Sequence, residues 1–175
     1  MNNRVLISGC SGGGKSSLID ALHDRGYPVV AEPGRRVIAS EEAQGGSAFP
    51  WADMPAFLDK ALQMAWQDLT TLQETADWVF FDRGVIDAVS AQAHFLNRPI
   101  DQRLLTTQVY HHTVFLVPPW PEIYRTDAAR RHDLKDAIAE HDRLSKVLAE
   151  MRYRVVSVPK MTIAERADFI LDQLA

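Results

Sequence analysis

Short apolar runs alternate with amphipathic stretches along the whole chain. Apolar runs of this length are typical of strands that are buried on both faces. The expected strands are RVLISG at 4–9, YPVVAE at 27–32, DWVFFDRG at 77–84, HTVFLVPP at 112–119 and YRVVSV at 153–158. The stretches between and after them predict helices at 15–25, 35–44, 54–74, 86–95, 101–109, 134–151 and 163–174.

The periodicity is clearest in two of these helices. Within 54–74 the apolar positions are Leu58, Leu62, Ala65, Leu69 and Leu72, which form one helical face. Within 134–151 the corresponding positions are Leu134, Ile138, His141, Leu144, Leu148 and Met151. Strands that alternate with helices predict a parallel sheet covered on both sides. Since no repeat or linker divides the chain, a single α/β domain over 1–175 is expected.

Composition narrows the possible partners and compartment. The net charge is −4, from 19 Lys and Arg against 23 Asp and Glu, so no general attraction to nucleic acid or to an anionic membrane is expected. The one cysteine, Cys10, fits a reducing compartment. No stretch is long enough to span a bilayer, and the apolar run near the N-terminus is too short for a secretory signal. These features favour a cytoplasmic protein and leave its oligomeric state open.

A glycine-rich segment lies between the first expected strand and the first helix. Residues 9–16, GCSGGGKS, match G-x-x-x-x-G-K-[S/T] at every fixed position. Glycines let backbone N–H groups surround phosphate oxygens, and the helix N-terminus adds partial positive charge. Lys15 is expected on the β- and γ-phosphates, exposed to the ligand and not needed for the fold, with the Ser16 hydroxyl on Mg²⁺. The alternative is a glycine-rich turn that binds nothing. The expected nucleotide contacts are Gly9, Ser11, Gly12, Gly13, Gly14, Lys15, Ser16 and Ser17.

The third expected strand ends in Asp82-Arg83-Gly84. Ligands of open α/β sheets bind at the carboxyl ends of the strands, which is also where the P-loop lies. Asp82 could hold Mg²⁺ through a water molecule or accept a proton, and Arg83 could pair with phosphate oxygens. Alternatively, Asp82 caps the helix that follows.

The second expected strand ends at Glu32, within AEPGRR, and therefore at the same edge. A carboxylate at this place could orient or deprotonate an acceptor hydroxyl. Arg35 and Arg36 could hold an anionic group of the second substrate. The alternative is a turn built from Pro33 and Gly34, with solvated arginines.

A basic cluster, YRTDAARRHD at 124–133, follows the fourth strand. Arg130 and Arg131 could close over the triphosphate as a lid, or they could belong to a solvated helix face. Two aromatic residues of the long connector, Phe49 and Trp51, could stack on an aromatic substrate. A metal site at 111–112 is not expected, because these histidines precede their strand and lie at the opposite edge.

Taken together, these segments resemble the P-loop kinases of small molecules. The likeness is to the ribosylnicotinamide kinase domain of NadR and to the small AAA-labelled NTP-binding proteins grouped with it. It runs through GCSGGGKSS, AEPGRRVI, WADMPAFLDKALQMAWQD, FFDRGVIDA and VFLVPPWPEIYRTDAARR. The resemblance implies a P-loop NTPase three-layer sandwich with sheet order 2-3-1-4-5, and it places 159–162 beside the nucleotide base. Asp82-Arg83-Gly84 is closer to the D/E-R signature of nucleoside and nucleotide kinases, which leaves the acceptor open.

The leading hypothesis is a phosphotransferase that moves the γ-phosphoryl group of ATP, or of GTP, to a small and possibly nucleoside-like metabolite, with Mg²⁺ as cofactor. The catalytic candidates are Lys15, Glu32, Asp82, Arg83 and Arg130. Either Glu32 or Asp82 could be the base. The alternatives are a nucleotide-binding switch or slow NTPase that acts through a protein partner, and a member that binds nucleotide without turnover. The chain has no N-K-x-D sequence, which disfavours a standard GTPase.

Overall fold

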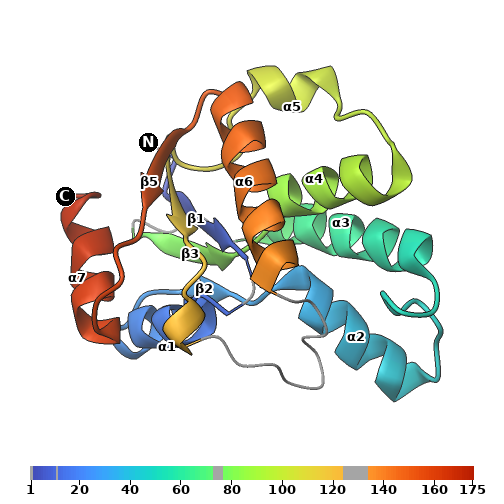
Figure 1. Cartoon of the computed structure of the whole chain (residues 1–175), viewed down its shortest axis with the longest axis horizontal. Coiled ribbons are helices and arrows are strands. Elements are labelled where there is room, and N and C mark those ends of the chain that lie inside the picture. Colours follow the sequence, from blue (N-terminus) through green and yellow to red (C-terminus); the bar gives the residue numbers. More distant parts are fainter. Residues whose placement is uncertain (1, 11, 73–76, 124–133) are drawn as a thin grey trace.

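A five-stranded parallel sheet with helices on both faces forms the centre of the molecule (Figure 1). The structure is a computed structural model that describes residues 2–10, 12–72, 77–123 and 134–175. The strands are β1 (Arg4–Gly9), β2 (Val29–Val30), β3 (Val79–Asp82), β4 (Thr113–Val117) and β5 (Arg154–Ser157). Their order is β2-β3-β1-β4-β5, as the resemblance implied.

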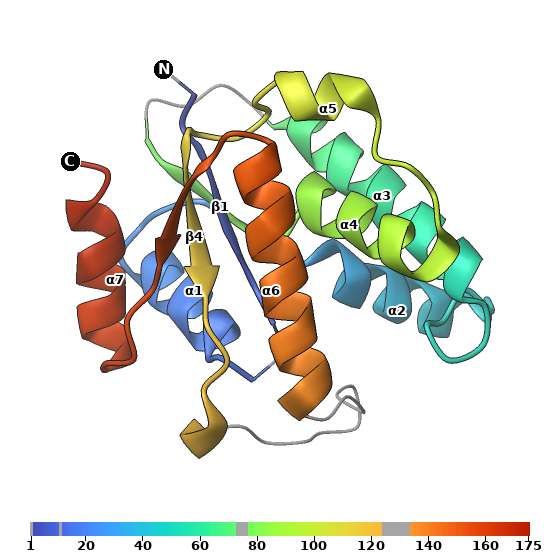
Figure 2. The same cartoon turned by 45° about the horizontal axis from the view of Figure 1, so that its top comes forward.

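The helices cover the sheet in two layers. They are α1 (Lys15–Asp24), α2 (Pro33–Gln44), α3 (Met54–Thr71), α4 (Val85–Leu96), α5 (Gln102–Thr106), the 3-10 turn η1 (Pro121–Ile123), α6 (Leu134–Glu150) and α7 (Ile163–Asp172). Figure 2 shows α1 and α7 on one face and α3, α4 and α6 on the other. Each face has its own apolar core, one packed under α1 and α7 and one under α3, α4 and α6. No helix in the described ranges is long and apolar enough to cross a membrane.

Several boundaries differ from the sequence prediction. Strand β2 is short because only Val29 and Val30 pair with β3. Helix α2 starts at Pro33, whose missing N–H is tolerated in a first turn, so the interpretation of Pro33-Gly34 as a separate turn was wrong. Helix α5 ends at Thr106 because the following residue is extended and leads toward β4. Ile138 was placed on the buried face of α6 but is 44% exposed.

The register of the sheet decides where the functional residues meet. Strand β1 lies between β3 and β4, with Ile7 opposite both Asp82 and Phe115 and with Gly9 opposite Val117. Because the strands are parallel, the residues that follow them reach one edge of the sheet. The P-loop, the turn after β3 and the start of α2 therefore lie side by side.

Candidate active site

The P-loop has the backbone that a phosphate cradle needs. Gly9, Gly12 and Gly14 have φ angles of 138°, 85° and 77°, in a region that side chains disfavour. A Cβ atom at Gly13 would lie 2.6 Å from the carbonyl oxygen of Pro118, so this glycine packs directly on the end of β4. The loop is thus bare backbone at the start of α1, which fits a phosphate group. Ser11 lies outside the described residues.

Charged residues from three elements converge beside this loop. The Lys15 ammonium pairs with Asp82, and its Nζ atom lies 3.9 Å from Oε2 of Glu32. The Nε atom of Arg35 lies 3.3 Å from the same Glu32 oxygen, and Nε of Arg83 lies 3.7 Å from Glu32 Oε1. The structure therefore brings together residues that are far apart in the sequence and that were expected here because each follows a strand.

Lys15 is more enclosed than the sequence suggested. Its side chain is 6% exposed, although the P-loop lysine was expected to be open to the ligand. Burial lowers the pKa of the Lys15 ammonium, while the carboxylates of Glu32 and Asp87 oppose that shift. A triphosphate would therefore compete with Asp82 for this ammonium group.

Glu32 stands directly before α2 and carries a stabilised negative charge. Burial alone would raise the pKa of its carboxyl group, but Arg83, Lys15 and Arg35 outweigh burial and lower it. Glu32 is consequently ionised at neutral pH and can accept a hydrogen bond from a substrate hydroxyl.

Arg83 is held by a residue that the sequence analysis missed. Its Nη1 atom donates to Oε1 of Glu140 on α6 over 2.7 Å, and its backbone N–H donates to the carbonyl of Ile7. Arg83 has a φ of 62°, and its side chain is 17% exposed. Burial opposes the charge of this guanidinium, but Glu140 and Glu32 raise its pKa. An acid in the middle of an amphipathic helix gives no sequence signal for this contact.

The turn that carries Asp82 and Arg83 is fixed by buried polar groups. Ser8 donates its hydroxyl to Oδ1 of Asp87 over 2.6 Å, and the Gly84 N–H donates to Oδ2 of the same residue over 3.1 Å. Burial raises the pKa of Asp87. Gly84 is the N-cap of α4, so the interpretation of Asp82 as the helix cap was wrong. The Asp82 carboxylate instead pairs with the Lys15 ammonium group.

Three other candidates have partners outside the charged cluster. The Nη1 atom of Arg36 donates to Asp68 over 3.0 Å, which ties α2 to α3 and uses a guanidinium that was expected to bind substrate. Phe49 and Trp51 stack on each other, with ring centroids 5.1 Å apart. Arg130 and Arg131, like the rest of the expected lid at 124–133, lie outside the described residues.

The oxygen donors beside the P-loop fit a hard divalent cation. Ser16 lies in the first turn of α1, next to Lys15, and Asp82 reaches the same place from β3. A hydroxyl, a carboxylate and phosphate oxygens form the kind of set that Mg²⁺ takes. Within the described ranges there is no cluster of three or more His, Cys, Asp or Glu residues that could hold a metal by itself. His111 packs against Trp78 at the far edge.

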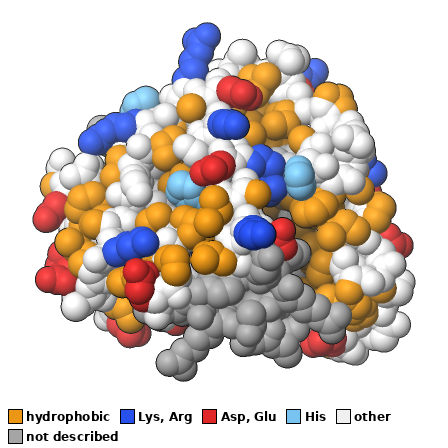
Figure 3. All heavy atoms as spheres, in the orientation of Figure 1, with side chains coloured by type: hydrophobic (Ala, Val, Ile, Leu, Met, Phe, Trp, Pro, Cys, Tyr) orange, Lys and Arg blue, Asp and Glu red, His pale blue; other side chains and the backbone are white. Residues whose placement is uncertain are grey.

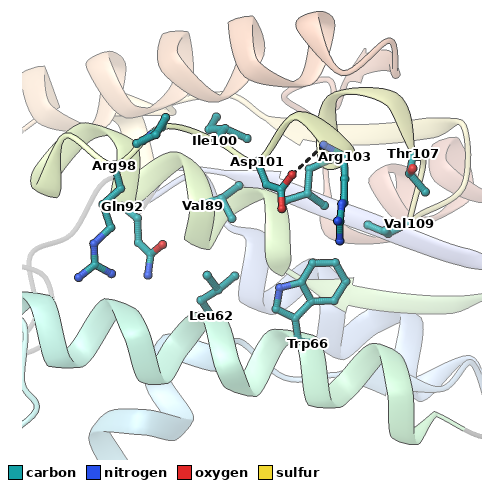
Figure 4. A pocket seen from close by; sticks show the side chains of 12 residues that line it. Leu62, Trp66, Val89, Gln92, Arg98, Ile100, Asp101, Arg103, Thr107 and Val109 are labelled. Atoms are coloured by element: carbon teal, nitrogen blue, oxygen red, sulfur yellow. Dashed lines mark hydrogen bonds between the residues drawn. The ribbon is translucent and has the colours of Figure 1, made fainter.

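A separate cavity of about 580 Å³ lies beside α3, α4 and α5 (Figure 4). Its lining includes Leu62, Trp66, Val89, Ile100, Leu104 and Val109. None of the P-loop or Glu32–Asp82 cluster contributes to it, so this cavity is distinct from the candidate active site. On the face drawn in Figure 3, charged side chains of both signs are interspersed. This face therefore carries no broad surface of one sign of charge among its described residues.

The fold and this site are those of a P-loop NTPase domain. The sequence matches the family model described as AAA domain over residues 4–166, and the chain belongs to that family. No curated protein sequence matches it significantly.

Solved structures show the same fold at low identity. Shikimate kinase from Aquifex aeolicus has a TM-score of 0.57 and 14% identity, covering 98% of this chain and 95% of that one. Deoxyadenosine kinase from M. mycoides with bound dATP has a TM-score of 0.56 and 14% identity, with 98% of each chain covered. Shikimate kinase from Acinetobacter baumannii in complex with shikimate has a TM-score of 0.60 and 13% identity, covering 98% and 92%. These values establish the fold. They do not identify the molecule that accepts the phosphoryl group.

Proposed function

We propose that this protein transfers the γ-phosphoryl group of a nucleoside triphosphate to a hydroxyl or phosphate group of a small, nucleoside-like metabolite. The observation that carries the proposal is the ionised Glu32 carboxylate beside Lys15 and Arg83. A switch that only binds nucleotide needs no carboxylate at this position, whereas a kinase needs one to orient its acceptor. The kinases of the same fold, one of them with shikimate bound, support a small hydroxylated acceptor.

The P-loop side of the site would hold the nucleotide. Its backbone N–H groups would surround the phosphates, and Lys15 would leave Asp82 for the β- and γ-phosphate oxygens. Ser16 and Asp82 would then hold Mg²⁺, which when bound neutralises charge on the phosphates. This exchange of partners keeps each buried charge paired both before and after the nucleotide binds.

The α2 side would hold the acceptor. Glu32 would accept a hydrogen bond from the attacking hydroxyl and then take its proton, because Asp82 is occupied with Lys15 or the metal. Its lowered pKa makes it a weak base, but a loose phosphoryl-transfer transition state demands positioning more than proton abstraction. Arg35, whose side chain is 53% exposed, is placed to meet a polar or anionic group of the acceptor.

Arg83 would stabilise the charge of the group in transfer. Glu140 and Glu32 hold its guanidinium at the same edge as Lys15. Preorganised cations of this kind are a large source of catalysis in a water-poor site. Arg130 and Arg131 would act as lid residues over the triphosphate, as the sequence resemblance implies.

The test is Mg²⁺-dependent release of nucleoside diphosphate, alone and with a panel of acceptors. The panel holds nucleosides, nucleotides, ribosylnicotinamide, shikimate and hydroxylated antibiotics. We expect one class to stimulate release, and we expect Glu32→Gln to lose about 10²- to 10⁴-fold of that stimulation while it still binds nucleotide. Glu42→Gln, an exposed acid on the same helix, is the matched control. Slow release that no acceptor accelerates, or a fully active Glu32→Gln, would contradict the proposal.

A further inference from the structure

Arg166, at the end of the first turn of α7, is a buried cation for which the described part of the chain shows no ion pair. It is 2% exposed and is among the largest fully buried side chains. Its Nε atom has no hydrogen-bond partner, and no carboxylate of the described residues offsets the effect of burial on its charge. The contact that the structure does show is with Trp120, whose ring centroid lies 5.7 Å from Cζ of Arg166.

This environment is unusual for an arginine. A guanidinium carries five N–H donors, and a buried charge is normally paired. Arg83, which is also enclosed, has Glu140 and Glu32 beside it. Burial alone lowers the pKa of Arg166, with no carboxylate to oppose it. The indole ring of Trp120 compensates only part of that cost, and the Nε–H group still has no hydrogen-bond acceptor among the described residues.

The strand order places this pair on the nucleotide side of the site. Glu32 follows β2 and Asp82 ends β3, so the acceptor groups lie to one side of the P-loop. Trp120 lies just after β4, and Arg166 lies in α7, the helix that follows β5; β4 and β5 continue the sheet on the other side of β1. Because the P-loop packs on the end of β4 at Pro118, Trp120 lies only a short way from the phosphate cradle.

The surroundings suit a flat, partly apolar group. Met161, two residues before α7, and Ile163, the first residue of α7, are 37% and 46% exposed. Exposed apolar side chains, an indole ring and a guanidinium with an unpaired Nε–H group together provide what a purine requires, which is a surface to pack on and donors for its edge.

We propose that Trp120 and Arg166 form the base subsite and that Arg166 selects a 6-oxopurine, as in GTP, over adenine. This inference rests on the proposed function, since it assumes that the P-loop binds a purine nucleotide. Guanine presents two neighbouring acceptors, O6 and N7, to which an arginine can donate two parallel hydrogen bonds. Adenine has a donor, the N6 amino group, in place of O6 and would leave one guanidinium N–H facing another donor.

The experiment compares the dissociation constants of Mg·GTP, Mg·ITP and Mg·ATP for the full chain by isothermal titration calorimetry. ITP keeps O6 and N7 but lacks the guanine amino group, so we expect it to bind like GTP. Each should bind about tenfold or more tighter than ATP. Because glutamine pairs with N6 and N7 of adenine, Arg166→Gln should shift the preference toward ATP by about tenfold or more. Arg166→Met, which has no donors, should bind both purines alike.

The control is Arg154→Gln, which removes an exposed arginine on β5 whose Nη2 atom donates to Gln173. It should keep the preference of the unchanged protein. Circular dichroism of each variant checks that it is folded, and Arg166→Met provides the test if Arg166→Gln does not fold.

Equal or tighter binding of ATP by the unchanged protein, or a preference that survives both Arg166 variants, would overturn the inference. The readout is binding without an acceptor, so it separates the two proposals. A protein that prefers GTP yet phosphorylates nothing refutes the proposed kinase and leaves the base subsite standing. A protein that phosphorylates an acceptor while binding both purines alike refutes the base subsite only. Failure to bind any of the three nucleotides refutes both.

Discussion

Replacing Glu140 by glutamine removes the charge that Arg83 pairs with and leaves the side-chain shape nearly unchanged. The two side chains are 24% and 17% exposed and their closest atoms are 2.7 Å apart. Exposed ion pairs are worth about 0.2–1 kcal/mol, whereas removing one partner of a fully buried pair costs about 3–5 kcal/mol. Because Glu32 still lies 3.7 Å from Arg83, we expect the free energy of unfolding to fall by an amount between these limits, about 2 kcal/mol.

The assay is urea unfolding followed by far-ultraviolet circular dichroism. Glu140→Gln should lower the midpoint without a change in slope, and by calorimetry it should lower Tm by roughly 4–8 °C. Asp142→Asn is the matched control, since Asp142 lies on the same helix with a side chain that is 64% exposed. It should stay within about 0.5 kcal/mol of the unchanged protein. A double-mutant cycle of Glu140→Gln with Arg83→Met should give a coupling energy of about 1–2 kcal/mol.

The loss of stability caused by Glu140→Gln should depend on pH. Burial opposes the charge of Glu140, but Arg83 outweighs it and lowers the pKa of this carboxyl group from its ordinary value of 4.5. Its contribution is therefore complete above about pH 4.5 and is lost as the pH falls through the folded-state value. The stability gap between the unchanged protein and Glu140→Gln should be full near neutral pH and should close in acid. A gap that persists in acid, or a variant that matches Asp142→Asn at neutral pH, would refute the reasoning.

Three further predictions concern single positions of the site. Lys15→Ala should abolish Mg²⁺-dependent nucleotide turnover, and an unchanged turnover rate would contradict the assignment of Lys15 to the nucleotide. The same variant should lower the unfolding midpoint, because Asp82 loses its partner. Gly84→Ala should cost about 1–3 kcal/mol in urea unfolding, since its Cβ would overlap the Tyr110 hydroxyl, and equal stability would count against this packing. Burial raises the pKa of Cys10 to about 11, so we expect very slow alkylation. At about pH 8 roughly 0.1% is thiolate, so iodoacetamide should react at least about 100-fold more slowly than with glutathione, and a glutathione-like rate would contradict the burial.

Much of the fold follows from the periodicity of the sequence. Apolar runs such as the one at 112–117 can be buried only between two layers of helices, so their alternation with helical stretches predicts the parallel sheet. The order of the strands came from the resemblance, because periodicity carries no information about which strands pair. The ends of β2 were misjudged because its pairing with β3 limits the strand, and that pairing depends on tertiary structure.

The candidate site, too, could be predicted in part from the sequence. Lys15, Glu32, Asp82 and Arg83 were predictable because each lies at the carboxyl end of a strand, where topology fixes the position. The direction of the Arg36 side chain could not be predicted, since one residue along a helix turns the side chain by about 100°. It faces Asp68 on α3 and not the cluster that Arg35 meets.

Glu140 and Arg166 lie within or near the start of helices, where charged residues are common and usually solvated. They differ from such solvated residues only through tertiary packing. Helix α6 packs against the turn at Arg83, and α7 packs against Trp120. Such contacts between distant elements leave no pattern in a single sequence.

The measurement that tests the central claim most directly is the fate of the γ-phosphate. The protein is incubated with γ-³²P-labelled nucleotide, Mg²⁺ and each acceptor of the panel, and labelled acceptor is separated from inorganic phosphate, with Lys15→Ala as the blank. We predict that one class of small hydroxylated metabolite carries the label in proportion to the diphosphate released, and that Lys15→Ala yields none. Label that appears only as inorganic phosphate, whichever acceptor is present, would contradict the assignment of this site to phosphoryl transfer.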